Sequence, residues 1–315
     1  MHTVLITGAS SGIGALTARR LADAGHRVYA GMRQVEGRNA PAAAAAASYS
    51  ADEGVDLQPL ELDVTDDGSI ERAASRLLDA GHVPDVVVHN AGHMVIGPAE
   101  AFSPAELADL YSINVLGTQR VNRALLPHLR ERGSGLLVWI GSSSTRGGTP
   151  PFLGPYFAAK AGMDALAVSY AAELSRFGIE VTIVVPGPFT SGTRHFENSG
   201  RPADTARAAA YDATYGQLQA EIPGRLAVLE PPDADVGAVA VAVADVVARP
   251  VGARPFRVHI DPTDDGAEVV SAVADRMRVE FFRRLGITEL LSVPAPDRVV
   301  ADVTEQRHTS REAVR

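Results

Sequence analysis

The amino-acid sequence predicts an α/β fold: a doubly wound parallel sheet of about seven strands, with helices on both faces and a helical extension at the C-terminus. Short runs of apolar residues alternate with helical patterns through most of the chain, and these runs are apolar throughout. Such strands are buried on both sides, as in a parallel sheet between two layers of helices. A glycine-rich turn directly after the first apolar run also favours this fold class.

The expected elements follow in chain order. Strands are predicted at residues 3–7, 27–32, 57–62, 86–89, 136–140, 181–185 and 256–260. Helices are predicted at residues 13–24, 69–80, 156–177, 235–248 and 267–285, with another that begins at Ser103-Pro104. Ser103 suits a helix N-cap and Pro104 the first helical position, where the missing N–H of proline costs nothing. The alanine tract at 42–47 is interpreted as a poorly constrained helix or a surface segment.

The chain is predicted to form one domain over residues 1–262, followed by a helical extension and tail over 263–315. A length of 315 residues is compatible with two domains, but α/β folds often reach about 250 residues as one. Residues 194–231 are polar with scattered aromatics, namely Phe196, Tyr211 and Tyr215. We expect this segment to be a mobile lid over the carboxyl edge of the sheet.

The composition excludes several functions. The net charge is −9 without a basic block, so no nucleic-acid partner is expected. The chain has no cysteine, which excludes disulfides, thiolate catalysis and cysteine-ligated metals, and no metal site is expected. The sequence begins directly with a strand pattern and has no apolar run of about 18 residues, so we expect a soluble, cytoplasmic protein without a membrane partner. Of 29 basic residues, 28 are arginine and one, Lys160, is lysine.

The turn after the first strand predicts a site for a dinucleotide. It reads Thr7-Gly8-Ala9-Ser10-Ser11-Gly12-Ile13-Gly14 and opens the first helix. Gly8 allows a tight turn, Gly12 allows the backbone to approach a pyrophosphate, and Gly14 allows helix and sheet to pack closely. The helix N-terminus supplies free N–H groups and a positive dipole to the phosphates. The alternative is that these glycines serve only packing.

The end of the second strand bears on which dinucleotide is bound. An acid at this position binds the ribose hydroxyls of NAD and repels the 2′-phosphate of NADP. Here the strand ends Gly31-Met32-Arg33, and the next acid is Glu36. The guanidinium of Arg33 suits a phosphate, so NADP(H) is favoured over NAD(H). The alternative is a surface arginine in a chain that is rich in arginine.

Tyr156 and Lys160 are predicted to carry proton transfer. Four residues apart at the start of a helix, they lie on one face. Tyrosine has an ordinary pKa of about 10, and a nearby ammonium is expected to lower that pKa toward working pH. A serine in the run Ser142–Ser144 at the end of the preceding strand is a candidate for binding a substrate carbonyl, although serines also favour turns. Asn114 lies within a helix, where it is either tolerated at the surface or bonded to something specific.

Together these residues resemble the short-chain dehydrogenase/reductase family, by motifs over residues 1–193 and more loosely to about 262. Thr7–Gly14 is similar to the family's TGxxxGxG turn. Asp63-Val64 resembles its adenine-binding pair, and Asn90-Ala91-Gly92 its NAG motif. The catalytic tetrad of the family falls on Asn114, Ser143, Tyr156 and Lys160; Ser143 is chosen because the family's serine precedes the tyrosine by thirteen residues. Two positions depart from the pattern: His89 stands where the family has asparagine, and Ser191 where it has threonine.

The resemblance implies a Rossmann fold and an NADP(H)-dependent oxidoreductase that interconverts a ketone or aldehyde and an alcohol, with Tyr156 as the acid and base. It implies cofactor contacts at the tyrosine and lysine of the tetrad and at the motif residues, which are Gly8, Ser10, Ser11, Gly12, Ile13, Gly14, Arg33, Asp63, Val64, Asn90, Ala91, Gly92, Pro186, Gly187, Thr190 and Ser191. It also implies a small-molecule substrate and a homodimer or homotetramer formed through the two long helices around the fifth strand. The alternatives are a nucleotide-sugar epimerase or dehydratase, and a nucleotide-binding sensor without catalysis. The sequence does not indicate the substrate or the direction of reaction.

Overall fold

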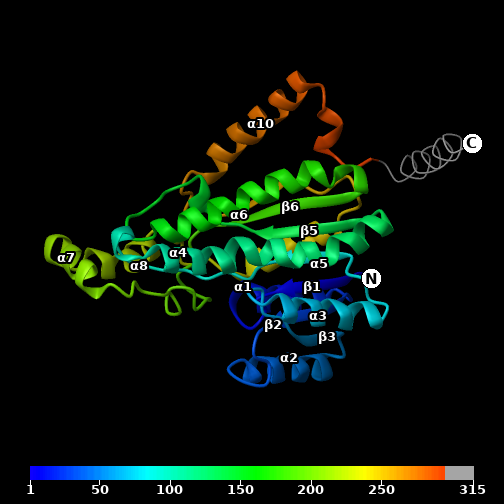
Figure 1. Cartoon of the computed structure of the whole chain (residues 1–315), viewed down its shortest axis with the longest axis horizontal. Helices are drawn as coiled ribbons and strands as arrows, with labels where there is room; N and C mark the ends of the chain where they lie inside the picture. Colours follow the sequence, from blue (N-terminus) through cyan, green and yellow to red (C-terminus); the bar gives the residue numbers. More distant parts are fainter. Residues whose placement is uncertain (295–315) are drawn as a thin grey trace, which may run out of the picture.

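The computed structural model, which describes residues 1–294, contains a seven-stranded parallel sheet in the order β3-β2-β1-β4-β5-β6-β7 (Figure 1). The strands are β1 (Thr3–Thr7), β2 (Arg27–Met32), β3 (Leu57–Glu61), β4 (Val86–His89), β5 (Gly135–Ile140), β6 (Ile179–Pro186) and β7 (Arg257–Ile260). Every neighbouring pair is parallel. The fold class that the sequence predicts is therefore confirmed. Strand order reverses between β1 and β4, and such a reversal opens a crevice at the carboxyl edge where ligands bind.

Two layers of helices cover the sheet, one on each face. On one face the apolar core is formed with α1 (Gly12–Asp23), α2 (Ala40–Glu53) and α9 (Gly237–Ala248). On the other it is formed with α3 (Asp67–Asp79), α5 (Gly117–Arg132) and α6 (Gly154–Glu173). The central strands β5 and β6 are buried along almost their whole length, which explains their continuous apolar sequence. Pro59 is accommodated because β3 is an edge strand with a side that needs no hydrogen-bonding partner.

Helix boundaries follow the local capping signals. Ser103 caps α4 (Pro104–Tyr111) in a capping box with Glu106, so the predicted start of this helix is confirmed. The predicted helix over 156–177 is divided in the structure: α6 ends at Glu173, and a short 3-10 turn, Ser175–Phe177, leads to Gly178 at φ +70°. The alanine tract lies within α2, with Ala46 packed against the sheet.

The segment 194–231 contains two helices that the sequence did not suggest, α7 (Thr205–Tyr215) and α8 (Leu218–Ala227). They lie at the carboxyl end of the sheet (Figure 1). None of the residues of α7 is buried, and only Ile222 of α8 is. With so little apolar surface covered, neither helix has the clear amphipathic pattern that sequence reasoning needs.

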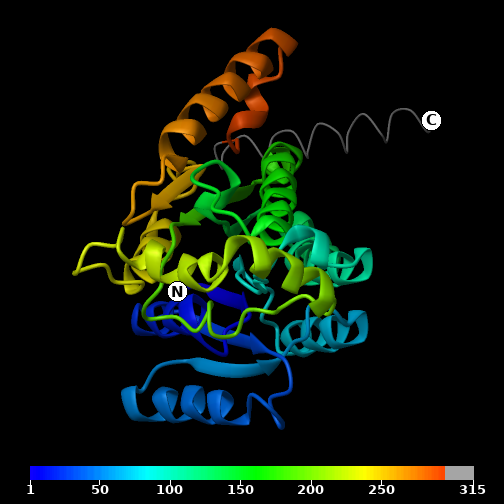
Figure 2. The ribbon, with the colours of Figure 1, turned by 90° about the vertical axis from the view of Figure 1, so that its left-hand side faces the viewer.

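The last described α-helix is α10 (Ala267–Leu285), whose bounds agree with the prediction. It stands out from the body of the molecule, at the end opposite to α2 (Figure 2). The predicted tail lies outside the described residues from 295 onward. Within residues 1–294, no helix is both long and apolar enough to cross a membrane.

Candidate active site

The glycine turn leaves the N-terminus of α1 accessible. Gly8 and Gly12 have φ values of +67° and +53°, which glycine adopts without strain. A Cβ at Gly8 would lie 2.7 Å from the Cα of Ala91, and one at Gly14 would overlap the Asn90 side chain. Within residues 1–294, the Ser11 side chain makes no capping hydrogen bond to α1. The first-turn N–H groups and the close backbone approach thus fit a bound pyrophosphate.

Asn90 fastens this turn to the end of β4. Its side-chain Nδ2 donates to the carbonyl oxygens of Thr7 and Gly8, at 3.0 and 2.9 Å. The Thr7 hydroxyl oxygen accepts hydrogen bonds from the backbone N–H groups of Asn90 and Ala91, both at 3.0 Å. The predicted Asn90-Ala91-Gly92 motif therefore lies against the glycine turn and holds its shape.

The tip of β2 presents Arg33 to solvent. The carboxylate of Glu61, at the end of β3, accepts hydrogen bonds from the backbone N–H groups of Gln34 and Val35, both at 2.8 Å. Each oxygen of the Glu61 carboxylate therefore already accepts a hydrogen bond from the backbone. The carboxylate of Asp63 accepts two hydrogen bonds from Thr65.

Tyr156 and Lys160 are both buried in the first two turns of α6, with exposed fractions of 8% and 4%. The Lys160 ammonium donates to the carbonyl oxygen of Ile140 at 2.9 Å. A Cβ at Gly92 would lie 3.6 Å from Lys160 Nζ and 3.0 Å from Asn114 Oδ1, so the glycine leaves room for both side chains. The structure therefore brings α6, the end of β5 and the NAG motif together, as the sequence predicted.

The pKa values of this pair differ from expectation. Burial raises the pKa of Tyr156 to about 12, against a smaller lowering by the nearby Ser142 hydroxyl. Burial also lowers the pKa of Lys160 to about 8. The expected lowering of the tyrosine pKa is thus absent in the protein without ligand, because burial disfavours the charged phenolate.

Asn114 is fully buried in a π-helical turn, Ser112–Leu116. Its Nδ2 donates to the carbonyl oxygens of His93 and Leu110, both at 3.0 Å, and its Oδ1 accepts from the N–H of His93. Asn114 is therefore not an asparagine tolerated at the helix surface but one that is bonded to specific partners, which was the second of the two interpretations. Such turns cost helix stability and are frequent at functional sites.

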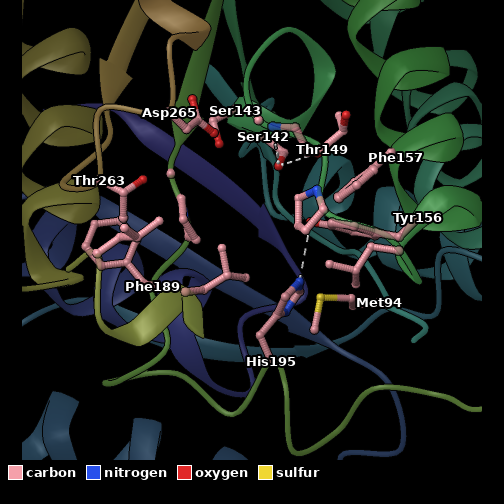
Figure 3. Close-up of a pocket in the computed structure, with 18 of the residues that line it drawn as sticks. Met94, Ser142, Ser143, Thr149, Tyr156, Phe157, Phe189, His195, Thr263 and Asp265 are labelled. Carbon is pink, nitrogen blue, oxygen red and sulfur yellow. Dashed lines mark hydrogen bonds between the residues drawn. The ribbon is translucent and has the colours of Figure 1, made fainter. Parts of the chain in front are cut away.

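The serines after β5 point to different partners. Ser142 lies close enough to Tyr156 to lower its pKa, whereas Ser143 lies beside Asp265 and acts on the pKa of that carboxyl. Ser142 Oγ also lies 2.8 Å from Ser144 Oγ. Figure 3 shows Ser143 next to Asp265. Spacing alone selected Ser143. Both serines line the same cavity, but the hydroxyl that acts on the pKa of Tyr156 is that of Ser142.

Two residues of the site were missed by the sequence analysis. His195, at the start of the 194–231 segment, places Nε2 3.4 Å from the Tyr156 hydroxyl (Figure 3). The surrounding protein, Lys160 and His93 all lower the pKa of His195, although its side chain remains accessible to solvent. Asp265 follows β7, and burial raises its pKa. Neither belongs to a recognisable motif, and both arrive from distant parts of the chain.

A cavity of about 400 Å³ opens in front of Tyr156. Most of its wall is apolar, while hydroxyl and carboxyl groups lie at the β5 and β7 ends. It is lined by Met94, Leu153, Phe157, Phe189, Phe196, Leu226 and Leu229 on the apolar side and by Ser142, Ser143, Thr149, Thr263 and Asp265 among the polar groups. Of the three aromatics noted in the 194–231 segment, only Phe196 lines this cavity.

The segment after β6 borders the same cavity. Gly187 lies so close to Asp261 that a Cβ there would overlap the carboxylate. The Thr190 N–H donates to the Glu230 carboxylate at 2.6 Å, which joins the two ends of the 190–230 stretch. Ser191 is exposed.

Comparisons with known proteins agree with this geometry. Human 17-beta-hydroxysteroid dehydrogenase type 1 is 39% identical over 190 residues, which are 59% of this chain and 56% of that protein. The chain spans about half the length of such curated relatives. A short-chain dehydrogenase from Streptomyces avermitilis superposes with a TM-score of 0.66 and 28% identity, covering 91% of this chain and 98% of that one. A gluconate 5-dehydrogenase from Burkholderia cenocepacia, in complex with NADP and tartrate, gives 0.63 and 25%, covering 83% and 94%.

The family assignment rests on sequence as well as on fold. A family model described as short chain dehydrogenase matches residues 2–202, which include the glycine turn, the NAG motif, Tyr156 and Lys160. With the matching architecture, this shows that the chain belongs to the short chain dehydrogenase family.

Proposed function

We propose that this protein is an NADP(H)-dependent oxidoreductase that interconverts a carbonyl compound and an alcohol. The observation that carries the proposal is the convergence of Tyr156 and Ser142 at a largely apolar cavity, with the buried Lys160 one turn further along α6 and an α1 N-terminus that no Ser11 side-chain hydrogen bond caps. The test is oxidation of NADPH in the presence of a panel of ketones and aldehydes.

In the proposed reaction, NADPH when bound supplies a hydride to the carbonyl carbon. The Tyr156 hydroxyl donates its proton to the carbonyl oxygen, and Ser142 donates a hydrogen bond to the same oxygen as negative charge develops. The Lys160 ammonium stabilises the phenolate that remains and binds a ribose hydroxyl. A tyrosine with a pKa of about 12 is protonated at neutral pH, so the resting site is prepared for carbonyl reduction.

Asn114 and His195 act on the reacting groups from either side. Asn114 holds the backbone of His93, the residue after Gly92, and Gly92 lies close to the Lys160 ammonium; this fixes one wall of the site. His195 occupies the position in front of the tyrosine hydroxyl that a substrate oxygen needs. The start of the 194–231 segment must therefore shift when substrate binds, in keeping with a role as a lid.

We assign each part of the cofactor to particular residues of the chain. Gly12, Ile13 and Gly14 would hold the pyrophosphate, Asp63 and Val64 the adenine, and Arg33 the 2′-phosphate. Solved relatives of comparable fold contain NADP, which supports the choice of this dinucleotide.

Arg33→Ala tests the preference for NADP. We expect the variant to bind NADPH about 10- to 100-fold more weakly, because charge-assisted hydrogen bonds to a phosphate contribute about 1.5–3 kcal/mol. NADH binding should stay nearly unchanged. Thermal shift titrations with both nucleotides measure this, with Arg20→Ala on the exposed side of α1 as control. Equal protection of the natural protein by NADPH and NADH would refute the role of Arg33.

Ser142→Ala and Ser143→Ala separate the two candidate serines. Loss of a hydrogen-bond donor to the developing oxyanion lowers kcat about 100- to 1,000-fold. We expect that loss for Ser142→Ala and a clearly smaller one for Ser143→Ala, whose hydroxyl faces Asp265. The reverse order would return the role to Ser143, as the thirteen-residue spacing suggested.

The proposed substrate is predominantly apolar and of moderate size. Cavity residues such as Met94, Phe157, Phe196 and Leu226 offer apolar contacts, and the cavity volume admits a compact molecule. Similar curated proteins are named for a hydroxysteroid, a ketodihydrosphingosine and retinol.

The homo-oligomer through α5 and α6 stays a prediction. Ala161 and Ala165 lie exposed along α6 and leave room for a partner helix.

A further inference from the structure

Asp265 brings a carboxyl group to the wall of the cavity in front of Tyr156. Among the described residues that line this cavity, Asp265 is the only acid, and none is lysine or arginine. Within residues 1–294, no basic side chain forms an ion pair with Asp265. A carboxylate beside apolar walls is costly unless it receives hydrogen bonds or meets a positive charge. The reaction proposed above gives this carboxyl group no role.

The loop after β5 is shaped around this carboxyl group. A Cβ at Gly147 would overlap the Asp265 carboxylate, so a larger residue there would displace it. The Gly148 N–H donates to the backbone carbonyl oxygen of Asp265 at 3.0 Å. On the other side, Asp265 Oδ1 accepts a hydrogen bond from the N–H of Ala267, at the start of α10, at 3.0 Å. Asp265 therefore has a fixed place between the segments that follow β5 and β7.

The contacts of Asp265 leave part of its acceptor capacity unused. An ionised carboxylate can accept about four hydrogen bonds, and Asp265 receives one from the Ala267 N–H and one from the Ser143 hydroxyl. The neighbouring Asp261 carboxylate is engaged by the Thr263 N–H and hydroxyl and by the Asp265 N–H. Burial and the nearby Asp261 raise the pKa of Asp265, whereas the Ser143 hydroxyl lowers it. A hydrogen-bond donor on a ligand would stabilise the ionised form in the same way as Ser143.

Asp265 also lies close to the reacting groups. Ser143, which bonds to it, directly follows Ser142, and the Ser142 hydroxyl lies beside Tyr156. Figure 3 shows Asp265 and Ser143 next to each other, with Ser142 on the same side of the cavity. A ketone whose oxygen is bonded by Tyr156 and Ser142 therefore brings the atoms next to its carbonyl carbon toward Asp265.

We propose that Asp265 determines substrate specificity by binding a hydrogen-bond donor, a hydroxyl or an ammonium group, on the carbon next to the reacting carbonyl. This inference rests on the proposed carbonyl reduction and narrows its substrates to α-hydroxy or α-amino ketones with an apolar remainder. Apolar side chains such as Phe157 and Leu226 contact that remainder. The pairing of the donor with the carboxylate then fixes which way round the ketone enters the cavity.

Acetophenones that differ only at the carbon next to the carbonyl test this directly. The α-hydroxy and α-amino compounds carry a donor there. The α-methoxy compound keeps the electron-withdrawing oxygen but has no donor, and acetophenone itself has neither. We expect the natural protein to reduce the α-hydroxy compound with a kcat/KM about 10- to 100-fold above that of the α-methoxy compound, the usual contribution of a hydrogen bond to a charged group. The difference should lie mainly in KM, because the donor is bound equally before and during hydride transfer.

The α-amino compound should likewise exceed the α-methoxy compound, and the better of the two donors identifies the group that Asp265 prefers. Calorimetric titration of the same compounds into the protein with NADP⁺ measures the preference without turnover.

Asp265→Ala should remove the preference, so that the α-hydroxy and α-methoxy compounds react equally well. This ratio is insensitive to a general loss of activity through Ser143, since such a loss affects both compounds alike. Asp265→Asn keeps the shape of the side chain without its charge and should lose more of the preference for the α-amino compound than for the α-hydroxy compound. Glu268→Ala, at an exposed position at the start of α10, is the matched control and should keep the natural ratio.

Two outcomes would overturn the proposal. One is a natural protein that shows no preference, because it binds the α-hydroxy and α-methoxy compounds equally well or binds neither. The other is an Asp265→Ala variant that keeps the natural ratio, which would place the selection on other residues. In both cases, reduction of acetophenone or another ketone would leave the proposed function in place. A natural protein that reduces no carbonyl compound would contradict the proposed function as well.

Discussion

Replacing Tyr156 with phenylalanine is expected to lower kcat for carbonyl reduction about 100- to 10,000-fold, the usual contribution of a general acid. The substitution removes only the hydroxyl, and the ring keeps its place in the apolar cluster with Met94 and Leu153. The bound carbonyl then has no proton donor on the α6 side. Steady-state kinetics at neutral pH, with NADPH and a carbonyl substrate, measure the loss.

Cofactor binding provides the control for this variant. The dissociation constant for NADPH should stay within about threefold of the natural value, since the pyrophosphate turn lies on α1 and not on α6. The matched control is Tyr170→Phe, farther along the same helix, where the hydroxyl bonds to Gln119. Retained turnover in Tyr156→Phe would place the acid elsewhere, with His195 the first residue to examine.

Lys160→Met is expected to remove activity and, in the protein without cofactor, to raise stability at pH 7. The ammonium is buried, and its folded pKa of about 8 lies below the ordinary 10.5. A difference of this size corresponds to about 3 kcal/mol of destabilisation at neutral pH. Loss of the hydrogen bond to the Ile140 carbonyl reduces the gain. Methionine fills a similar volume without a charge.

The stability difference between the natural protein and Lys160→Met is expected to depend on pH. Between pH 8 and 10.5 the unfolded chain binds more protons at Lys160 than the folded protein does. The natural protein therefore becomes more stable as the pH rises through this window. Below pH 8 the destabilisation by the buried ammonium is fully present. Urea unfolding at pH 7 and pH 10 should show the variant's advantage at pH 7 and a smaller one at pH 10. A variant that is less stable at both pH values would contradict the account.

The sequence predicts the strands of this fold well because burial on both faces demands continuous apolar runs. The runs at Thr3–Thr7 and Val86–His89 agree with the structure at both ends. The helices α7 and α8 were missed, since they cover little apolar surface, and since Gly216 directly follows α7 and Pro223 lies inside α8. Their helical structure depends on capping and local contacts, such as the Asp204 cap of α7, which leave a weak pattern.

The positions of the residues at the glycine turn and on α6 could be predicted because these positions depend on fixed local spacing. His195 and Asp265 could not, since their place beside Tyr156 and Ser143 depends on tertiary structure. Spacing alone also could not tell Ser142 from Ser143. The pKa of Tyr156 was expected to fall, but burial raises it. The spacing of two residues does not reveal how deeply they are buried, so this rise could not be predicted.

The most direct test of the central claim is the oxidation of NADPH, followed at 340 nm, with a panel of predominantly apolar ketones and aldehydes. The natural protein should consume NADPH with at least one member and form the corresponding alcohol in equal amount. Tyr156→Phe should consume almost none, although it binds NADPH normally. If the natural protein binds NADPH but reduces no carbonyl compound and oxidises no alcohol, or if Tyr156→Phe reacts as fast as the natural protein, the proposed function is contradicted.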